Sequence, residues 1–462
     1  MVRPILSYGA TIWINGTHKK HNQQLLMGVQ RLANVLSTGA MPSTPSAALN
    51  VITGFPPITM WLSEAAAKET LRLKCHGHWE FPPPGKPSVR LKSHICTNEK
   101  TIKALPRDIV STELDLITPS LSIDQHFTVD IPDRSSYSEL AGEDFDVVCY
   151  TDGSRMNDHT GAGMMICGGP QLVHLDHREA FYLGKHSTVF QAEVFAVGKA
   201  ADHLLGNKLR ERKILINCDS KSAIQSIDST VIRNRTSLTA TTTLNSLGIN
   251  NEVTLRWIPA HSGYEGNEIA DQLAKAGSSN DNNSATCVLL PVPRSICYAA
   301  LRSKTKEDWK VFYKSKPPRT FDMFWRDRFA KELSKMSRRD LRVATQLLTG
   351  HAALNYHLKK VNPTVSTTCP LCQAEDETVS HFLGGCPSLG SIRAEYFDTY
   401  LCTAREIFDR CSISKIVSYA HRTMRNCSLQ YRVINQRNYS IFFAHNIVHG
   451  ASLCSHSMFK SN

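Results

Sequence analysis

The stretch Val147-Val-Cys-Tyr-Thr-Asp-Gly-Ser154 decides the fold of this chain. It begins with an apolar and β-branched run, which predicts a buried strand, and the carboxylate of Asp152 follows that run directly. A second apolar run ends at Cys218, directly before Asp219. Both carboxylates therefore lie at the carboxyl ends of predicted strands, where ligands of α/β sheets tend to bind.

A third carboxylate, Glu193, lies between these two in the sequence, on a predicted helix. Apolar residues recur at helical spacing from Phe190 to Leu204, so one face of this helix should pack on the sheet. Three early strands followed by alternating helices and strands predict an α/β fold with a mixed sheet and flanking helices. We expect strands near 146–151, 161–167, 172–183, 213–218 and 253–258, and further helices from residue 221 and over 267–276.

Clustered carboxylates repel one another and raise each other's pKa, and divalent cations remove that cost. Oxygen ligands of this kind suit Mg²⁺ or Mn²⁺. Two such ions roughly 3.5–4 Å apart can activate water and stabilise the leaving oxygen of a phosphodiester. His261, shortly before a fourth carboxylate, Asp271, can move protons at the rim of such a site. Any one of these Asp residues, taken alone, also suits a helix cap or a turn.

This segment resembles a type-1 ribonuclease H domain, in the form carried by Jockey-like non-LTR retrotransposon polyproteins near the end of the reverse transcriptase reading frame. The resemblance implies metal-ligand roles for Asp152, Glu193, Asp219 and Asp271, with two Mg²⁺ or Mn²⁺ ions, and a mobile catalytic role for His261. It also implies cleavage of the RNA strand of RNA–DNA hybrids, leaving 3′-hydroxyl and 5′-phosphate ends. The matching residues are Thr151-Asp-Gly-Ser154, Ala192-Glu193, Cys218-Asp-Ser220, His261-Ser-Gly263 and Gly266-Asn-Glu268 followed by Asp271.

Four further residues are candidates for substrate contacts. Gly153 lacks a Cβ and can let the backbone approach a phosphodiester. Ser154, Ser220 and Asn267 can bind sugar or phosphate oxygens, although each suits a helix cap equally well. Between Asp219 and Trp257 the chain carries Thr and Ser runs in place of the basic, Trp-rich substrate-gripping helix of bacterial members of the family. We therefore expect weak hybrid affinity from the isolated domain.

The sequence around this segment divides by composition. We predict a nuclease domain over 145–277 between two linkers, a small helical module before them that resembles the thumb region of reverse transcriptases, and a basic helical region with a basic tail after them. The family's polymerase palm requires an Asp-Asp pair, which this sequence lacks, so polymerisation by this chain is not expected. The predicted boundaries are 1–75 for the helical module, 76–144 and 278–290 for the linkers, 291–415 for the basic helical region and 416–462 for the tail.

The positive charge lies in the C-terminal third. The chain has a net charge of +12, and from Pro291 onward it holds 26 Lys or Arg against 13 Asp or Glu. Such a surplus attracts polyanions, so we expect this region to bind RNA or DNA. A merely solvated face is the alternative. Trp309 and Trp325 stand among these cations, and we expect them in a core rather than stacked on bases.

A second metal motif lies in the same region. Cys369, Cys372, His381 and Cys386 follow the spacing C-x2-C-x8-H-x4-C, which suits a closed tetrahedral zinc site. The alternative is four incidental residues in a chain with 14 cysteines. The middle spacer is longer than that of retroviral zinc knuckles, so their RNA specificity is not transferred.

The expected location is intracellular, in the nucleus or the cytoplasm, with reduced thiols and no membrane partner. The N-terminus lacks a sustained apolar signal segment, and no run of eighteen apolar residues occurs. Two functions are compatible with these observations. One is a hybrid-specific ribonuclease, and the other is a non-catalytic nucleic-acid-binding remnant of a retroelement that acts through its basic and zinc-binding region.

Overall fold

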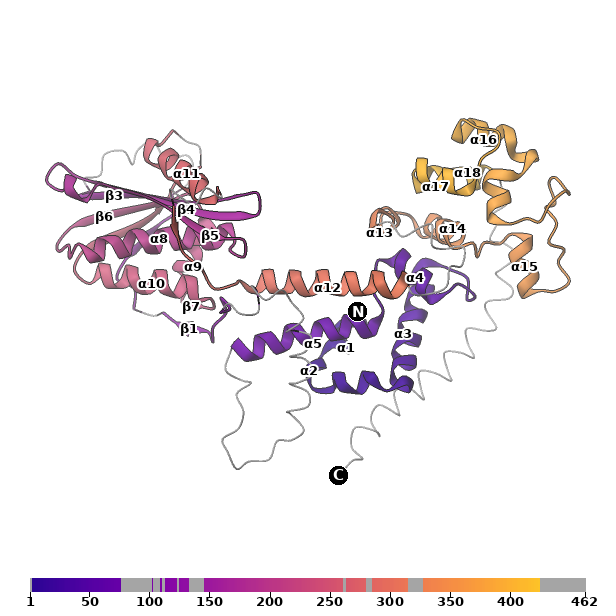
Figure 1. The fold of residues 1–462 in the computed structure, drawn as a ribbon, viewed down its shortest axis with the longest axis horizontal. Coiled ribbons are helices and arrows are strands. Elements are labelled where there is room, and N and C mark those ends of the chain that lie inside the picture. Colours follow the sequence, from indigo (N-terminus) through magenta and orange to yellow (C-terminus); the bar gives the residue numbers. More distant parts are fainter. Residues whose placement is uncertain are drawn as a thin grey trace, which may run out of the picture. The chain divides into compact units, whose positions relative to one another are not determined.

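The computed structural model describes residues 2–75, 102, 109, 113–122, 124–132, 145–260, 263–279, 285–314 and 327–423. The chain forms two compact units (Figure 1). The sheet unit comprises Ala65–Lys304, and the helical unit comprises Met1–Glu64 together with Thr305–Asn462. Two long helices, α5 (Ile58–Cys75) and α12 (Arg294–Lys314), contribute residues to both units.

The sheet unit is built on one seven-stranded mixed sheet, which confirms the predicted α/β fold class. The central strands β3, β4 and β5 pair antiparallel, whereas β6 pairs parallel with both β3 and β8. In sheet order the strands are β2 (Thr128–Asp130), β8 (Glu252–Trp257), β6 (Lys213–Cys218), β3 (Val147–Met156), β4 (His159–Gly168), β5 (His177–Gly184) and β9 (Thr286–Cys287).

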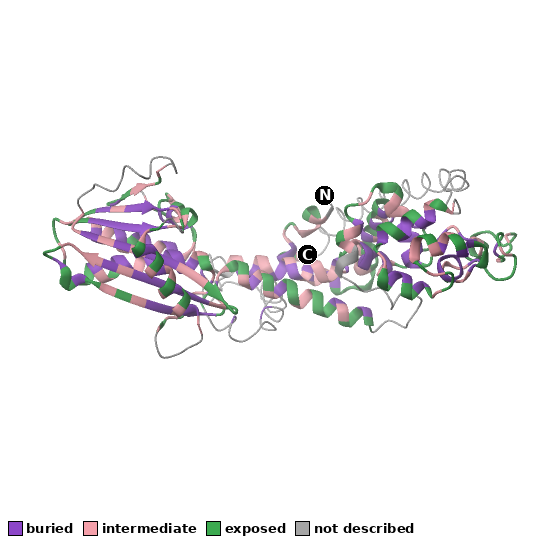
Figure 2. Cartoon of the chain, turned by 90° about the horizontal axis from the view of Figure 1, so that it is seen from above, coloured by how far each residue is buried: buried purple, intermediate pink, exposed green. Residues whose placement is uncertain are grey.

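Helices cover both faces of this sheet. Figure 1 shows α11 (Glu265–Ser278) on one face and α8 (Val189–Gly206), α9 (Lys221–Ile227) and α10 (Arg235–Gly248) on the other. The helix α8 starts at a capping box, in which the side chain of Thr188 accepts from the Gln191 N–H and the Gln191 side chain accepts from the Thr188 N–H. The buried positions follow the strands and the inner helix faces (Figure 2). Each fully buried aliphatic side chain contributes roughly 1.5–3 kcal/mol to this core.

The helix α10 forms where the sequence predicted only Thr and Ser runs. Threonine is a weak helix former, so this helix depends on its packing against α8, where Ala240 lies opposite Gly198. Several Thr hydroxyls donate back to the preceding turn, as Thr242 does to the Leu238 carbonyl at 2.8 Å. This helix carries a single cation, Arg235, and no Trp, in line with the absence of a basic, Trp-rich helix that the composition indicated.

The predicted linkers contribute strands to the sheet unit. Part of 76–144 forms β2, which pairs with β8, and Asp130 of β2 bonds Arg256 at 2.7 Å. Part of 278–290 forms β9, which pairs with β5. The expectation of a tether throughout was therefore wrong for these residues, because strands of two or three residues are too short to show alternation. A further pair, β1 (Ser120–Leu121) and β7 (Val231–Ile232), is antiparallel.

The strand predicted over 172–183 begins later than expected. Val173–Leu175 form a 3₁₀ turn, and β5 starts at His177. The Asp176 carboxylate accepts a bond from the Gly168 N–H at 2.8 Å and closes this turn.

In the helical unit, a residue of the N-terminal helices shares one core with residues 333–420. Ile52 of α4 belongs to the same buried cluster as Leu347, Leu383 and Phe408. The boundaries 1–75 of the helical module and 291–415 of the basic helical region remain predictions. The structure shows that residues from both segments share this core. The helices are α1 (Val2–Ser7), α2 (Ala10–Trp13), α3 (Lys20–Thr38), α4 (Ser46–Thr53), α13 (Asp327–Leu333), α14 (Arg338–Thr349), α15 (Asn355–Val361), α16 (Gly390–Phe397), α17 (Ala404–Arg410) and α18 (Ile413–Arg422).

The aromatic residues of the basic region divide into two groups. Trp309 and Tyr313 are buried beside Val51, which confirms the expected core role of Trp309. Trp325 and most of the predicted tail lie outside the described residues. Within the part of the chain that the structure describes, no helix has both the length and the apolar character needed to cross a bilayer.

Candidate functional site

Three of the predicted carboxylates converge at one edge of the sheet. Asp152, Glu193 and Asp219 each place one carboxylate oxygen within 4.8 Å of the other two. Strands β3 and β6 are parallel neighbours with Thr151 opposite Cys218, so the residues that follow this pair lie side by side. This register brings Asp152 and Asp219 together, as the two apolar runs predicted.

Glu193 reaches the site because α8 approaches β3 very closely at Gly153. A Cβ on Gly153 would lie 2.8 Å from the Glu193 backbone nitrogen and 2.9 Å from the Ala192 Cβ. Only glycine therefore allows this helix–strand distance. The structure gives Gly153 a packing role, and the predicted approach of a phosphodiester to its backbone stays a prediction.

The fourth carboxylate, Asp271, borders the other three from α11. Asp152 is paired with Gly163, and a Cβ on Gly163 would lie 2.3 Å from the Ala270 carbonyl oxygen. This close packing places α11 over β4 and brings Asp271 near Asp152. The negative charge of Asp271 is one of the causes that raise the pKa of Asp152, after burial and the charge of Asp219. The Lys275 ammonium lies 2.5 Å from Asp271 Oδ2.

Burial and mutual repulsion raise the pKa values of the clustered carboxylates. Burial, followed by the charge of Asp219, raises the pKa of Asp152 to about 7. Burial and the charge of Asp152 raise the pKa of Glu193 well above its usual range. The Gly153 N–H bonds to both carboxylates and opposes these shifts. A divalent cation at this point would favour the ionised forms, and the hard oxygen donors fit Mg²⁺ or Mn²⁺.

The family model of RNase H matches residues 144–279. This segment is an RNase H domain. A similar solved structure is RNase H1 from the halophilic archaeon Halobacterium salinarum NRC-1, at 19% identity and a TM-score of 0.23. The match covers 28% of this chain and 96% of that chain. No curated protein matches the chain.

Three residues beside the carboxylates of the RNase H domain were not predicted as neighbours. Cys218 Sγ lies 3.8 Å from Glu193 Oε2. The Trp257 indole donates to the Asp219 carbonyl at 2.9 Å, and the Lys221 ammonium lies 3.8 Å from the centroid of the Trp257 ring. The positions of Lys221 and Trp257 near the carboxylates could have been predicted from the sequence. Lys221 starts α9 directly after β6, and Trp257 ends the adjacent strand β8.

The remaining predicted residues of the RNase H domain differ in their surroundings. Ser220 caps α9 by accepting from the Ala223 N–H at 3.3 Å. Asn267 is buried in α11, and its Oδ1 has no hydrogen-bond partner among the described residues. Ser154 is partly buried on β3. His261 lies outside the described residues, so its role stays a prediction.

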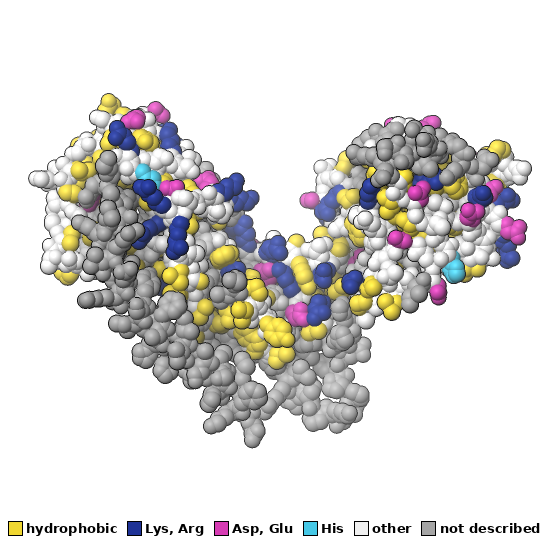
Figure 3. All heavy atoms as spheres, turned by 180° about the vertical axis from the view of Figure 1, so that it is seen from behind, with side chains coloured by type: hydrophobic (Ala, Val, Ile, Leu, Met, Phe, Trp, Pro, Cys, Tyr) yellow, Lys and Arg dark blue, Asp and Glu magenta, His cyan; other side chains and the backbone are white. Residues whose placement is uncertain are grey.

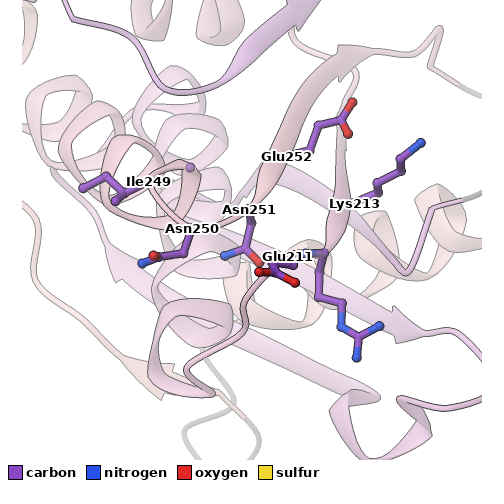
Figure 4. Close-up of a pocket in the computed structure, with 8 residues that line it drawn as sticks. Glu211, Lys213, Ile249, Asn250, Asn251 and Glu252 are labelled. Atoms are coloured by element: carbon purple, nitrogen blue, oxygen red, sulfur yellow. Dashed lines mark hydrogen bonds between the residues drawn. The ribbon is translucent and has the colours of Figure 1, made fainter.

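A pocket at the far ends of the strands is separate from these carboxylates. It encloses about 420 Å³ between residues 211–213 and 248–252 (Figure 4). Lys213 begins β6 and Glu252 begins β8, whereas Asp219 follows the carboxyl end of β6. No predicted site residue lines this pocket, and ligands of α/β sheets bind at the opposite strand ends.

The four predicted zinc ligands also come together, in the helical unit. One donor atom from each of Cys369, Cys372, His381 and Cys386 lies within 4.8 Å of the others. The Cys372 Sγ is 3.4 Å from His381 Nε2, and the Cys369 Sγ is 3.9 Å from the Cys386 Sγ. A compact set of three thiols and one imidazole fits tetrahedral zinc.

The surroundings of this cluster favour the thiolate form at Cys372 and disfavour it at Cys386. Bonds from the N–H groups of Ala374 and Glu375 lower the pKa of Cys372 to about 7, whereas burial and Cys369 raise the pKa of Cys386 to about 11. A bound cation favours thiolates at every ligand cysteine.

Proposed function

We propose that this chain is a metal-dependent endonuclease that cleaves the RNA strand of RNA–DNA hybrids. The observation that carries the proposal is the convergence of Asp152, Glu193 and Asp219 within 4.8 Å inside an RNase H domain. Membership of this domain in the RNase H family supports hydrolysis of hybrids. The crowding of raised-pKa carboxylates supports divalent cations as the cofactors.

The roles of the site residues in this proposal follow from their positions. Asp152 and Asp219, at the ends of adjacent strands, would hold the region shared by two Mg²⁺ or Mn²⁺ ions. Glu193 would orient the nucleophilic side, and Asp271 would complete the second metal site. When bound, the metals supply a hydroxide-like nucleophile and charge stabilisation at the leaving oxygen. His261 is proposed to assist product release.

Cleavage assays with matched variants test this function. Labelled RNA–DNA hybrid, single-stranded RNA and duplex DNA are incubated with Mg²⁺ and wild type, Asp152→Asn or Glu193→Gln. Asp202→Asn is the control, because Asp202 is an exposed carboxylate on the same helix as Glu193 and pairs with Lys199. We expect hybrid-only cleavage by wild type and the control, and none by the two site variants. Full activity in Asp152→Asn would refute the site.

We propose in addition that Cys369, Cys372, His381 and Cys386 bind one structural zinc. Their convergence supports it, as does the donor set of three thiols and one imidazole, which fits tetrahedral zinc. Metal analysis of the purified full chain should find one zinc per molecule, and Cys369→Ser should lose it. A wild-type protein prepared with zinc in the medium and found metal-free would contradict this site.

A second candidate function is nucleic-acid binding without catalysis. The favouring observation is the surplus of cations after Pro291, of which Arg302, Arg338 and Arg339 are exposed. Figure 3 shows Lys and Arg side chains at the surface of the face that it draws. Binding of hybrid, RNA or DNA with no Mg²⁺-dependent cleavage would favour this function over the nuclease. We propose in addition an origin in a Jockey-like non-LTR retrotransposon, which the order of the motifs supports, and an intracellular location.

A further inference from the structure

The two ring nitrogens of His381 face different partners. His381 Nε2 faces the Cys372 Sγ, whereas His381 Nδ1 lies 2.9 Å from Glu375 Oε2. The His381 side chain is only 3% exposed, so this orientation is fixed by its surroundings. A neutral imidazole carries one N–H. If Nδ1 carries that proton and donates to Glu375, Nε2 presents its lone pair to the metal cluster.

A second residue holds the turn between the last two ligands. His381–Gly385 form a π-turn, closed by the bond from the Cys386 N–H to the His381 carbonyl at 2.7 Å. Such a turn leaves carbonyls without their usual helical donors. Arg393 supplies donors, with Nε 2.8 Å from the Leu383 carbonyl and Nη2 2.8 Å from the Cys386 carbonyl. Arg393 therefore fixes the backbone that positions Cys386.

The guanidinium of Arg393 is a positive charge buried in the core of the helical unit. The Arg393 side chain is fully buried. It donates to the backbone carbonyls of Leu383, Cys386 and Tyr400 and bonds the Tyr419 hydroxyl. None of the carboxylates in the described ranges forms an ion pair with it. A buried cation is costly unless a negative charge lies nearby. Zinc held by three thiolates and one neutral imidazole has a net negative charge, which would offset the guanidinium.

We infer that Glu375 and Arg393 are positioning residues of the zinc site. Glu375 selects the His381 tautomer that binds metal through Nε2, and Arg393 holds the Cys386 turn while balancing the charge of the metal–thiolate centre. This inference rests on the zinc site of the proposed function. Partners of metal ligands typically change metal affinity by about 10–100-fold when they are removed.

Zinc affinity of the full chain tests this inference. A chromophoric chelator competes for zinc with wild type, Glu375→Ala and Glu375→Gln. Asp376→Asn is the matched control, since Asp376 is the exposed carboxylate next to Glu375 in the chain. We expect roughly tenfold to hundredfold weaker binding in Glu375→Ala, a smaller loss in Glu375→Gln, which keeps an acceptor oxygen, and wild-type affinity in the control.

A spectroscopic readout separates positioning from general stability. The ¹⁵N shifts of the His381 ring in the zinc-bound wild type should report a protonated Nδ1 and a metal-bound Nε2, and Glu375→Ala should broaden or shift the Nδ1 signal. Arg393→Lys keeps the charge but loses the planar fork, so zinc binding should weaken less than in Arg393→Met. If Arg393→Met does not fold, the Arg393→Lys comparison and the Glu375 variants still decide the inference.

The outcomes distinguish the two levels of the proposal. Wild-type protein that takes up no zinc overturns the zinc site and this inference together. Zinc binding that is equal in wild type, Glu375→Ala and Asp376→Asn overturns the Glu375 role alone, and equal binding in Arg393→Lys overturns the need for the fork. Hybrid cleavage is measured separately on the same variants, so failure of the nuclease proposal remains visible on its own.

Discussion

Lys275 and Asp271 form an ion pair one helical turn apart on α11, with Nζ 2.5 Å from Oδ2. Asp271 stands beside the three converging carboxylates rather than among them. The Lys275 ammonium bonds the Asp271 carboxylate, which in the proposed function would be a ligand of the second metal ion. Because the Lys275 side chain is half exposed, the pair is weak enough for a divalent cation to replace it.

Removal of this ammonium should lower the metal concentration that cleavage requires. In Lys275→Gln, Asp271 is free for the metal, so we expect the Mg²⁺ concentration for half-maximal cleavage to fall by about two- to fivefold, in keeping with a surface ion pair. Lys199→Gln is the control, since it breaks a comparable exposed pair with Asp202 on α8. A Mg²⁺ requirement that rises in Lys275→Gln would instead assign Lys275 to the substrate.

The stability of the metal-free protein should fall as the pH rises from the unfolded-state pKa of Asp152 to its folded-state pKa. Its pKa is raised from 3.8 to about 7 in the fold, so the folded state binds a proton that the unfolded state has lost. Stability is then greatest below about pH 4 for this group and declines toward pH 7. Added Mg²⁺ should restore more stability at pH 8 than at pH 5.

Thermal unfolding with and without Mg²⁺ at the two pH values measures this coupling. Asp152→Asn, which removes both this titration and a proposed metal ligand, should lose most of the Mg²⁺ stabilisation that wild type shows at pH 8. Stabilisation by Mg²⁺ that is equal at both pH values in wild type would show that the carboxylate cluster does not bind the ion.

Gly153→Ala should separate Glu193 from the other two carboxylates. The new Cβ would meet the Glu193 nitrogen at 2.8 Å and the Val189 carbonyl at 3.0 Å, so α8 must move away from β3. Overpacking of this kind costs roughly 1–3 kcal/mol of stability, and loss of the cluster geometry should abolish cleavage. Gly206→Ala, at the end of the same helix with nothing within 4 Å of the added Cβ, should cleave as wild type does.

The sequence could predict this cluster because two signals coincide there. Apolar runs mark where β3 and β6 end, and a carboxylate follows each run, so strand adjacency alone brings Asp152 and Asp219 together. Helical periodicity then places Glu193 on the packed helix. The pair of Asp271 and Lys275 was also within reach, since residues four apart on a helix are neighbours.

Other features have no periodic signal in the sequence. The strands β2 and β9 span three and two residues, which alternation cannot reveal. The helix α10 depends on contacts with α8 that override the weak propensity of its threonines. The buried cluster that Ile52 shares with Leu347 and Leu383 joins residues far apart in the chain, and the composition of neither segment indicates its partner.

Ile52→Ala should therefore destabilise the region of the Cys369, Cys372, His381 and Cys386 cluster, although Ile52 lies in the N-terminal helices. Ile52 is 3% exposed and shares a core with Leu347 and Leu383, so the cavity should cost roughly 2–5 kcal/mol. Hydrogen exchange of α14 (Arg338–Thr349) in the full chain measures the effect, with faster exchange expected than in wild type. Ile12→Ala, at a site 65% exposed, is the control and should leave α14 protected. Unchanged protection in Ile52→Ala would mean that α4 can leave this core without opening it, and the N-terminal helices would then be a separate folding module.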